Sequence, residues 1–474
     1  MKANQLLDVT STVEITNITN DSRAIKPGGL YFAIKGLTVD GHDYISSAIT
    51  NGAVAIIHTS DVEQQAGILY VKVPDIYVAY NKIASDFWGN PATKLKVIGT
   101  TGTNGKSTTS WIIDDILNRK YSCGYIGTIG IKAGEELLPS TFTTLLPHQY
   151  NQIFSDMVAS NKEYAAIEVS SQGLDQHRTD FLEFDYAIMT NLTHEHLDYH
   201  ITMENYLQAK ALLFTQVKPQ GLAIINNDDL ASASYLIEHT KGKVVTYGID
   251  HESDIMAKDV KLLPSSTEFT LVYFGAEYPL KTNLVGRFNV YNLLAAIAVV
   301  LDAGITIEEL QEMASNLTQV EGRMVMIEND KDLNVIVDYA HTPDGFTQVY
   351  KHIQTISTGK IISVFGSAGL RDVLKRPILG EISDQYSDLI ILTADDPKKE
   401  DPKVIADEIA AGIKTTPIEY IEDREAAIYH AFAIAKPGDT IAILSKGHDA
   451  YQKGADGLIP YDGDVVIAKR ASLQ

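Results

Sequence analysis

The residues best suited to chemistry form a glycine-rich segment, Gly102-Thr-Asn-Gly-Lys-Ser-Thr-Thr109. The apolar stretch before it is typical of a buried strand, and the stretch after it has the periodicity of a helix. Glycines let the backbone curl until its amide N–H groups point at phosphate oxygens, and the N-terminus of the next helix adds partial positive charge. Lys106 would then contact the terminal phosphates, and Ser107 or Thr108 a magnesium ion. The pattern predicts a nucleotide-phosphate site, although Thr100 stands where the common motif has its first glycine.

Further polar residues follow other predicted strands. Glu168 ends one of them, and a carboxylate there suits a hard cation such as magnesium. His194, His196 and His200 suggest zinc, but the His-Glu-x-x-His spacing is absent, so polar loop histidines are the alternative. Lys210, by its position alone, is an ordinary helical lysine.

The elements that must position these residues alternate along the chain. Strands are expected at 165–170, 186–192 and 222–228, with helical periodicity between them. Such alternation indicates an α/β fold with a mostly parallel sheet and helices on both faces. Open sheets of this kind bind ligands at the carboxyl ends of their strands, where the polar residues cluster.

Three domains are predicted. Residues 1–92 form a small α/β domain, residues 93–320 a central domain with the phosphate loop, and residues 321–474 a Rossmann-like domain. In the last, the segments KIISVFG, DLIILTADD and TIAILSKG are typical of strands. Asp401-Pro402 is expected to cap and begin a helix there.

Composition limits the classes of partner. The 474 residues carry a formal net charge of -22, which disfavours nucleic acid and anionic membranes. Cys123 is the single cysteine, which suits a reducing compartment. The sequence has neither a signal-peptide pattern nor a run of about 18 apolar residues. A cytoplasmic protein that does not insert into membranes is expected, and we expect a monomer.

The phosphate loop belongs to a series of motifs that together resemble the Mur ligase family, and most closely its MurE branch. These motifs are Asp21-Ser-Arg23, Gly36…Asp40-Gly-His42, the Thr-Gly-Thr-Asn-Gly-Lys-Ser-Thr loop, Glu168-Val-Ser-Ser-Gln-Gly-Leu-Asp-Gln-His-Arg178, Thr190-Asn-Leu-Thr-His-Glu-His-Leu-Asp-Tyr-His200, Gly286-Arg-Phe-Asn289 with Asn292, Glu321-Gly-Arg323, Val337-Asp-Tyr-Ala-His-Thr-Pro-Asp344, Lys375-Arg-Pro377, Asp395-Asp-Pro-Lys398 and Ser445-Lys-Gly-His-Asp449. They occur in order across nearly the whole chain.

The resemblance implies an ATP-dependent ligase of peptidoglycan synthesis that uses Mg²⁺. ATP would phosphorylate the γ-carboxylate of UDP-N-acetylmuramoyl-L-alanyl-D-glutamate, and the amine of a diamino acid would displace phosphate from the acyl phosphate. The N-terminal domain would bind the uridine nucleotide, and the C-terminal domain the amino acid. Because these parts lie in separate domains, closure of the C-terminal domain on ATP is expected.

The resemblance also implies roles for single residues. Lys106, Glu168, His196 and Lys210 would be catalytic; Ser107, Glu168, His196 and Lys210, carbamoylated by CO₂, would hold magnesium. The nucleotide would contact Gly102, Thr103, Asn104, Gly105, Lys106, Ser107, Thr108, Asn289, Arg323 and Asp338. The other substrates would contact Ser22, His42, Thr143, Thr144, Ser170, Gln176, Arg178, Arg376, Asp395, Asp396, Lys398, Gly447 and Asp449. Leu145-Leu146 departs from the family's usual residues after the Thr pair, and Glu195 replaces an aspartate.

The amino acid is the open point. Arg376 is expected to bind its α-carboxylate, and the loop Asp395-Asp-Pro-Lys398 to discriminate the side chain. Enzymes of this branch that add diaminopimelate resemble Asp-Asn-Pro-Arg there, and those that add lysine resemble Asp-Asp-Pro-Asn. Asp396 favours a distal ammonium, and Lys398 a distal carboxylate. L-Lysine is therefore the first prediction, with meso-diaminopimelate next and ornithine third.

Two other classes of protein remain as alternatives. A sister ligase such as folylpolyglutamate synthase would leave the uridine-nucleotide motifs at 21–23 and 36–42 unexplained. A non-catalytic nucleotide-binding paralogue would be expected to have lost Lys106, Glu168, His196 or Lys210, yet all are present.

Overall fold

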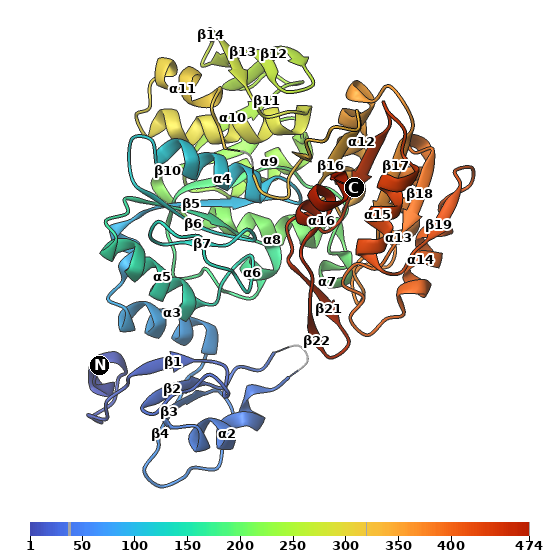
Figure 1. The fold of residues 1–474 in the computed structure, drawn as a ribbon. Coiled ribbons are helices and arrows are strands. Elements are labelled where there is room, and N and C mark those ends of the chain that lie inside the picture. The colour runs from blue at the N-terminus through green and yellow to red at the C-terminus, as the bar shows by residue number, and fades with distance from the viewer. Residues whose placement is uncertain (37–38, 319, 474) are drawn as a thin grey trace.

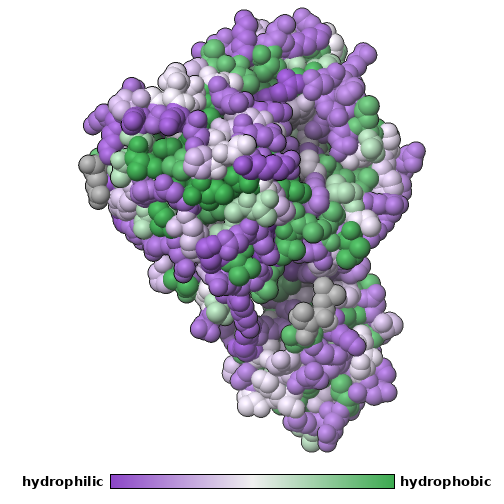
Figure 2. Space-filling view, turned by 90° about the vertical axis from the view of Figure 1, so that its right-hand side faces the viewer, coloured by the Kyte–Doolittle hydropathy of each residue, from purple (hydrophilic) through white to green (hydrophobic). Residues whose placement is uncertain are grey.

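A computed structural model describes residues 1–36, 39–318 and 320–473. Figure 1 shows the chain as an N-terminal domain at the bottom, a central domain above it and a C-terminal domain to the right. In Figure 2 the N-terminal domain forms a smaller lobe below the rest of the molecule. The predicted boundaries near 92 and 320 fall in segments between the sheets. Within the described residues, no helix is long and apolar enough to cross a membrane.

The N-terminal domain is built on a parallel sheet in the order β1-β2-β3-β4. Its strands are buried on both faces, because Leu30 and Phe32 pack in the cluster that contains α3, while Tyr31 packs in the cluster that contains α2. The elements are α1 (Ala3–Leu6), β1 (Asn17–Thr19), β2 (Gly29–Phe32), the 3-10 helix η1 (Gly41–Tyr44), α2 (Ile45–Thr50), β3 (Ala53–His58), β4 (Leu69–Lys72), α3 (Ile76–Phe87) and the 3-10 helix η2 (Pro91–Lys94).

The central domain has a mostly parallel sheet in the order β14-β13-β12-β11-β10-β9-β5-β8-β6-β7. Alternate residues of β5 face opposite sides: Ile98 packs in the core cluster with α4 and α10, and Val97 in the cluster with α5 and α8. The strands are β5 (Lys96–Thr101), β6 (Cys123–Ile126), β7 (Ile131–Lys132), β8 (Tyr164–Glu168), β9 (Phe184–Met189), β10 (Val217–Asn226), β11 (Lys243–Gly248), β12 (Ile255–Leu262), β13 (Thr267–Tyr273) and β14 (Ala276–Thr282). The helices are α4 (Lys106–Leu117), α5 (Pro147–Ala159), α6 (Ser171–Asp175), α7 (Leu197–His200), α8 (Met203–Thr215), α9 (Leu230–His239), α10 (Arg287–Asp302) and α11 (Ile307–Ala314).

The C-terminal domain has a sheet in the order β15-β16-β20-β17-β18-β19 and a separate hairpin, β21-β22. Asp401 caps α14 by accepting a hydrogen bond from the Lys403 amide, with Pro402 in the first turn, as predicted. The strands are β15 (Val325–Met326), β16 (Asn334–Val337), β17 (Ile361–Phe365), β18 (Leu389–Leu392), β19 (Ile418–Tyr420), β20 (Thr440–Ile443), β21 (Tyr451–Gly454) and β22 (Gly457–Pro460). The helices are α12 (Pro343–Ile356), α13 (Lys375–Tyr386), α14 (Pro402–Ala410), α15 (Arg424–Ile434) and α16 (Asp464–Ser472).

The α/β class and the parallel sheets are confirmed. The segments predicted as strands at 165–170, 186–192 and 222–228 overlap β8, β9 and β10. The antiparallel strands β13 and β14, which extend the central sheet, were not among the predicted strands. Parallel pairing of β5 with β8 and β9 brings the ends of these strands to one edge, where the site lies.

Candidate active site

The glycine-rich loop joins β5 to α4, as the strand–loop–helix pattern requires. Gly102 has φ +146° and Gly105 φ +86°; a Cβ atom would lie 1.8 Å from the Thr190 hydroxyl at the first and 2.3 Å from the Asn292 side-chain oxygen at the second. Only glycine fits such positions. The Lys106 Nζ donates to the carbonyls of Gly102 and Thr103 at 2.9 and 3.0 Å, so it folds back over the loop. The loop thus presents its amides and a lysine at the start of a helix, which is an anion site.

Glu168 lies at the end of β8, beside the phosphate loop. Its carboxylate accepts hydrogen bonds from the Ser107 hydroxyl at 2.9 Å, from the Thr128 amide at 2.8 Å and from the Tyr125 hydroxyl. Its side chain is buried, and Arg323 of the C-terminal domain donates to Ser107 at 3.3 Å. These contacts hold a carboxylate and a hydroxyl together next to a phosphate site.

The oxygens of Ser107 and Glu168 fit a magnesium ion that takes its remaining ligands from phosphates and water. Burial, followed by the positive charges of Lys210 and Lys106, lowers the pKa of His196 to about 2. A neutral imidazole keeps a lone pair for a metal. Within the described parts of the chain, however, no three His, Cys, Asp or Glu side chains stand together as a ready metal site.

Lys210 lies on α8, directly behind the phosphate loop, and is 1% exposed. Its Nζ donates to the Gly102 carbonyl at 2.8 Å and lies 4.3 Å from the Tyr206 ring centroid. Burial, together with nearby Lys106, lowers the pKa of Lys210 well below its ordinary value. A buried lysine without a carboxylate partner among the described residues is unusual, which makes Lys210 a candidate for a functional role.

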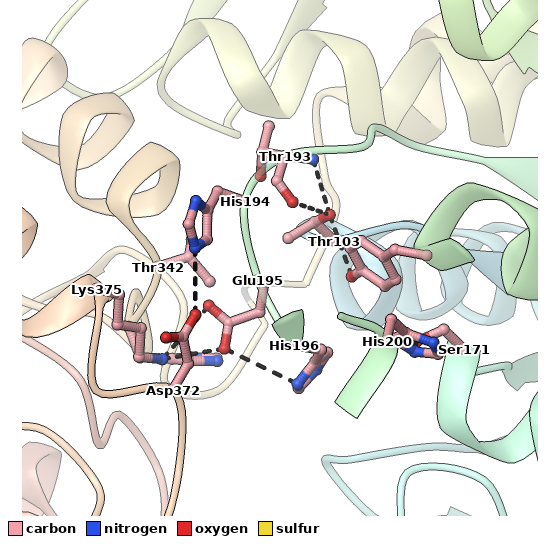
Figure 3. A network of polar contacts seen from close by, with 12 residues as sticks. Thr103, Ser171, Thr193, His194, Glu195, His196, His200, Thr342, Asp372 and Lys375 are labelled. Carbon is pink, nitrogen blue, oxygen red and sulfur yellow. Dashed lines mark hydrogen bonds and ion pairs between the residues drawn. The ribbon is translucent and has the colours of Figure 1, made fainter. Parts of the chain in front are cut away.

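The histidine cluster does not converge on one ion. Figure 3 shows His194 directed at Asp372 of the C-terminal domain, at 3.2 Å, and His200 at Ser171, at 2.9 Å. His196 alone of these three lines the cavity described below. This arrangement argues against the zinc alternative and leaves His196 as the candidate functional histidine of the segment.

Contacts between the central and C-terminal domains close the site. The Lys375 Nζ, at the start of α13, lies 3.0 Å from the Glu195 carboxylate, and both side chains are buried (Figure 3). On the phosphate loop, the side-chain amide of Asn104 makes two contacts. Its nitrogen donates to the Asp344 carboxylate at 3.0 Å, and its oxygen accepts from the Thr342 hydroxyl at 3.1 Å. The C-terminal domain therefore contacts both the phosphate loop and the segment that carries His196.

We expect Lys375→Met to lower kcat/KM for ligation at least about thirtyfold, since it leaves the Glu195 carboxylate buried and unpaired. Steady-state ADP release measures this loss. Glu195→Gln combined with Lys375→Met should recover part of it, because neither charge is then buried alone. Lys72→Met, which removes a surface pair with Asp61, is the matched control and should change nothing. A double variant as impaired as the sum of both single variants would contradict the coupling.

A cavity of about 1120 Å³ lies between the central and C-terminal domains. The sequence-predicted residues that line it are Thr103, Asn104, Gly105, Lys106, Ser107, Thr108, Thr143, Thr144, Glu168, Ser170, Arg178, His196, Arg323, Asp338, Asp395, Asp396, Lys398 and Asp449. Most of the predicted nucleotide and amino-acid residues are therefore brought together at one site.

Other predicted residues lie outside this cavity. Gly102 begins the phosphate loop and Lys210 lies behind it. Asn289, in the first turn of α10, donates to the Val285 carbonyl just before that helix, and Gln176 accepts a hydrogen bond from Arg178. Ser22 and His42 belong to the N-terminal domain, where His42 pairs with Asp40 at 2.6 Å. Gly447, with φ +57°, packs against Gly322.

Arg376 does not line the cavity, although it was predicted to bind the α-carboxylate of the amino acid. The side chain is fully buried and its guanidinium forms ion pairs with Glu400 at 2.8 Å and Glu408 at 2.6 Å. It joins α13 to α14 and is not part of the cavity lining. An exposed arginine that lines the cavity is Arg371, which was not among the predicted site residues. Its one signal was its place after β17, in the loop that starts at Gly366.

The departure at Leu145 has a structural reason. Leu145 is 1% exposed and packs in the core of the central domain, while Thr143 and Thr144 face the cavity. The Thr144 hydroxyl donates to Ser170 at 3.0 Å, and Arg178 donates to the Thr144 carbonyl at 2.6 Å. Leu145 is thus directed into the core, while the two threonines before it line the cavity.

Comparisons with known proteins agree with this geometry. Family models match in order: "Mur ligase family, catalytic domain" over residues 14–97, "Mur ligase middle domain" over 100–300 and "Mur ligase, glutamate ligase domain" over 322–447. A UDP-N-acetylmuramoyl-L-alanyl-D-glutamate--2,6-diaminopimelate ligase from Caldanaerobacter subterraneus is 41% identical over 458 residues, which cover 96% of this chain and 94% of the relative. One of the same name from Halalkalibacterium halodurans is 40% identical, covering 97% and 94%.

Solved structures are also similar. A structure of a UDP-N-acetylmuramoyl-L-alanyl-D-glutamate--2,6-diaminopimelate ligase superposes with a TM-score of 0.66 at 30% identity, covering 98% of this chain and 96% of that one. The MurF ligase of Thermotoga maritima in complex with ADP has a TM-score of 0.68 at 20% identity, covering 97% and 96%, and shows the fold alone. The chain is a ligase and belongs to the Mur ligase family.

Proposed function

We propose that this chain uses ATP and Mg²⁺ to join a diamino acid to the D-glutamyl γ-carboxylate of UDP-N-acetylmuramoyl-L-alanyl-D-glutamate. The observation that carries the proposal is the interdomain cavity, which places the phosphate loop and Glu168 opposite the loop Asp395–Lys398. The names of relatives that match over nearly their whole length support it. A cytoplasmic monomer remains the prediction for its location and state.

The first step needs charge neutralisation, because a carboxylate attacks a phosphate. An oxygen of the γ-carboxylate forms a bond to the γ-phosphorus of ATP, the bond to ADP breaks, and an acyl phosphate results. Lys106, Arg323 and the amides at the start of α4 would bind the phosphates. Bound magnesium would supply further positive charge next to Ser107 and Glu168.

Lys210 would act in the same step as a carbamate. The neutral amine adds to CO₂ and loses a proton, which turns it into an anion able to hold a second magnesium ion. The low pKa of the buried Lys210 supplies the neutral amine that this addition needs.

In the second step the neutral amine of the amino acid attacks the acyl carbon and loses a proton, the bond to the phosphate oxygen breaks, inorganic phosphate leaves and an amide forms. The amino acid would lie at the carboxyl ends of β17, β18 and β20, which are neighbours in the sheet. Contact of the C-terminal domain with the phosphate loop brings this edge to the acyl phosphate and excludes water.

We propose 2,6-diaminopimelate as the preferred amino acid, ahead of L-lysine. The preference for lysine depended on Asp396, but that carboxylate already accepts a hydrogen bond from the Lys446 Nζ at 2.7 Å. Arg371 and Lys398 line the cavity without an ion-pair partner among the described residues, and they suit the carboxylates of diaminopimelate. Asp449 also lines the cavity and is the feature that suits an amine, so lysine remains the second candidate.

An amino-acid panel tests this choice. We expect kcat/KM for meso-diaminopimelate to exceed kcat/KM for L-lysine at least about tenfold. Lys398→Asn should lower kcat/KM for meso-diaminopimelate about ten- to a hundredfold, because a charge-assisted contact is lost. Product mass and ADP release are the measurements. The exposed neighbour Lys399, changed to Asn, is the control and should behave as wild type. Product formation with L-lysine alone would exclude diaminopimelate.

A further inference from the structure

The hairpin β21-β22 is attached to the amino-acid loop by its backbone. The Lys398 amide donates to the Lys453 carbonyl at 2.8 Å, and the Lys453 amide donates to the Asp396 carboxylate at 3.0 Å. Figure 1 shows the hairpin descending from the C-terminal domain toward the N-terminal domain. Its first strand therefore forms one wall of the place where the amino acid is expected.

The loop beneath the hairpin has a fixed conformation. Asp396 and Lys398 have φ of +44° and +54°, in the left-handed region that residues other than glycine rarely adopt. The Gly369 amide donates to the Asp396 carbonyl at 3.0 Å, and a Cβ at Gly369 would lie 2.0 Å from the Pro397 carbonyl oxygen. The segments after β17, β18 and β20 are thus joined by backbone hydrogen bonds and packed closely against one another.

These segments each contribute a cation to the cavity: Arg371 from the loop after β17, Lys398 from the loop after β18 and Lys453 from strand β21 of the hairpin. The Lys453 Nζ lies 3.7 Å from the Asp396 carboxylate, while Lys446 is closer to the same carboxylate at 2.7 Å. Asp396 is thus shared between a buried lysine and one that is 43% exposed. Because its contact with Asp396 is the longer of the two, the Lys453 ammonium can also pair with an anion in the cavity.

We infer that Lys453 is a specificity-determining residue, which together with Lys398 binds the second carboxylate of a diamino dicarboxylic acid. The inference depends on the proposed function, since it concerns the amino acid of that same site. A ligand with one carboxylate would satisfy Arg371 and leave Lys398 and Lys453 facing each other. A second carboxylate between them removes that repulsion. The backbone bond from the Lys398 amide to the Lys453 carbonyl, and the contacts of Lys453 with Asp396, hold the two residues side by side.

The test compares Lys453→Met with Lys453→Arg and with Lys399→Met. For Lys453→Met we expect KM for meso-diaminopimelate to rise about ten- to a hundredfold, KM for L-lysine to change less than about threefold, and KM for ATP to stay unchanged. Lys453→Arg should restore most of the affinity, which a merely structural role for the side chain would not require. Lys399→Met removes an exposed charge from the same loop and should match wild type.

The outcomes separate the two claims. Wild-type protein that forms no product with any diamino acid would refute the proposed function. Ligation of diaminopimelate that is unaffected by Lys453→Met would overturn the inference and leave the function standing. Equal losses with diaminopimelate and L-lysine, or wild-type use of L-lysine alone, would also overturn it.

Discussion

Lys210→Ala is expected to lower the rate of ligation at least about a thousandfold. The side chain is buried directly behind the phosphate loop, and its Nζ contacts the Gly102 carbonyl. Alanine cannot form the carbamate that would hold a magnesium ion there. The free energy of unfolding should stay constant or rise, because burial of Lys210 lowers its pKa and so favours the unfolded chain, in which this amine is protonated and solvated. Steady-state ADP release and thermal unfolding measure the two effects.

Controls separate carbamoylation from the loss of a charge. Lys210→Arg keeps a cation but cannot add CO₂, so it should be as inactive as Lys210→Ala. The exposed Lys241, changed to Ala, should have no effect. In wild-type protein supplied with ¹³C-bicarbonate, a carbamate resonance is expected, and it should vanish in Lys210→Arg. Wild-type rates in Lys210→Ala would refute the role of this lysine.

Glu168→Gln is expected to reduce kcat about a hundred- to a thousandfold, since the carboxylate would hold magnesium opposite the phosphates. The amide group of glutamine would also face the Thr128 amide and the Ser107 and Tyr125 hydroxyls, which all donate hydrogen bonds to Glu168. Because the glutamine NH₂ group cannot accept a hydrogen bond from these donors, the free energy of unfolding should fall by about 1–3 kcal/mol. Initial rates over a magnesium titration and denaturant unfolding are the measurements.

The matched control is Glu163→Gln, next to the start of the strand that Glu168 ends, because the side chain is exposed and far along the strand from the phosphate loop. It should leave rate and stability unchanged. Glu168→Asp keeps the charge but shortens the reach, so partial activity at higher magnesium concentration is expected. Normal magnesium dependence in Glu168→Gln would show that another group holds the ion.

The sequence by itself determined the phosphate loop and the ends of the strands around it. Gly102, Gly105 and Lys106 are contiguous with one strand and one helix, so local rules fix their geometry. Glu168 was predictable for the same reason, because a strand end in a parallel sheet places its next side chains at a known edge. The cap at Asp401 likewise needed only its neighbours.

The tertiary structure decided which charges are free to bind a ligand. Arg376 and Arg371 are five positions apart, yet only the folded chain shows that the first pairs with Glu400 and Glu408 while the second faces the cavity. Asp396 is engaged by Lys446 and Lys453, from a loop and a hairpin about fifty residues away. An ion pair depends on the distance between groups that are remote in sequence, and motif spacing carries no information about that distance.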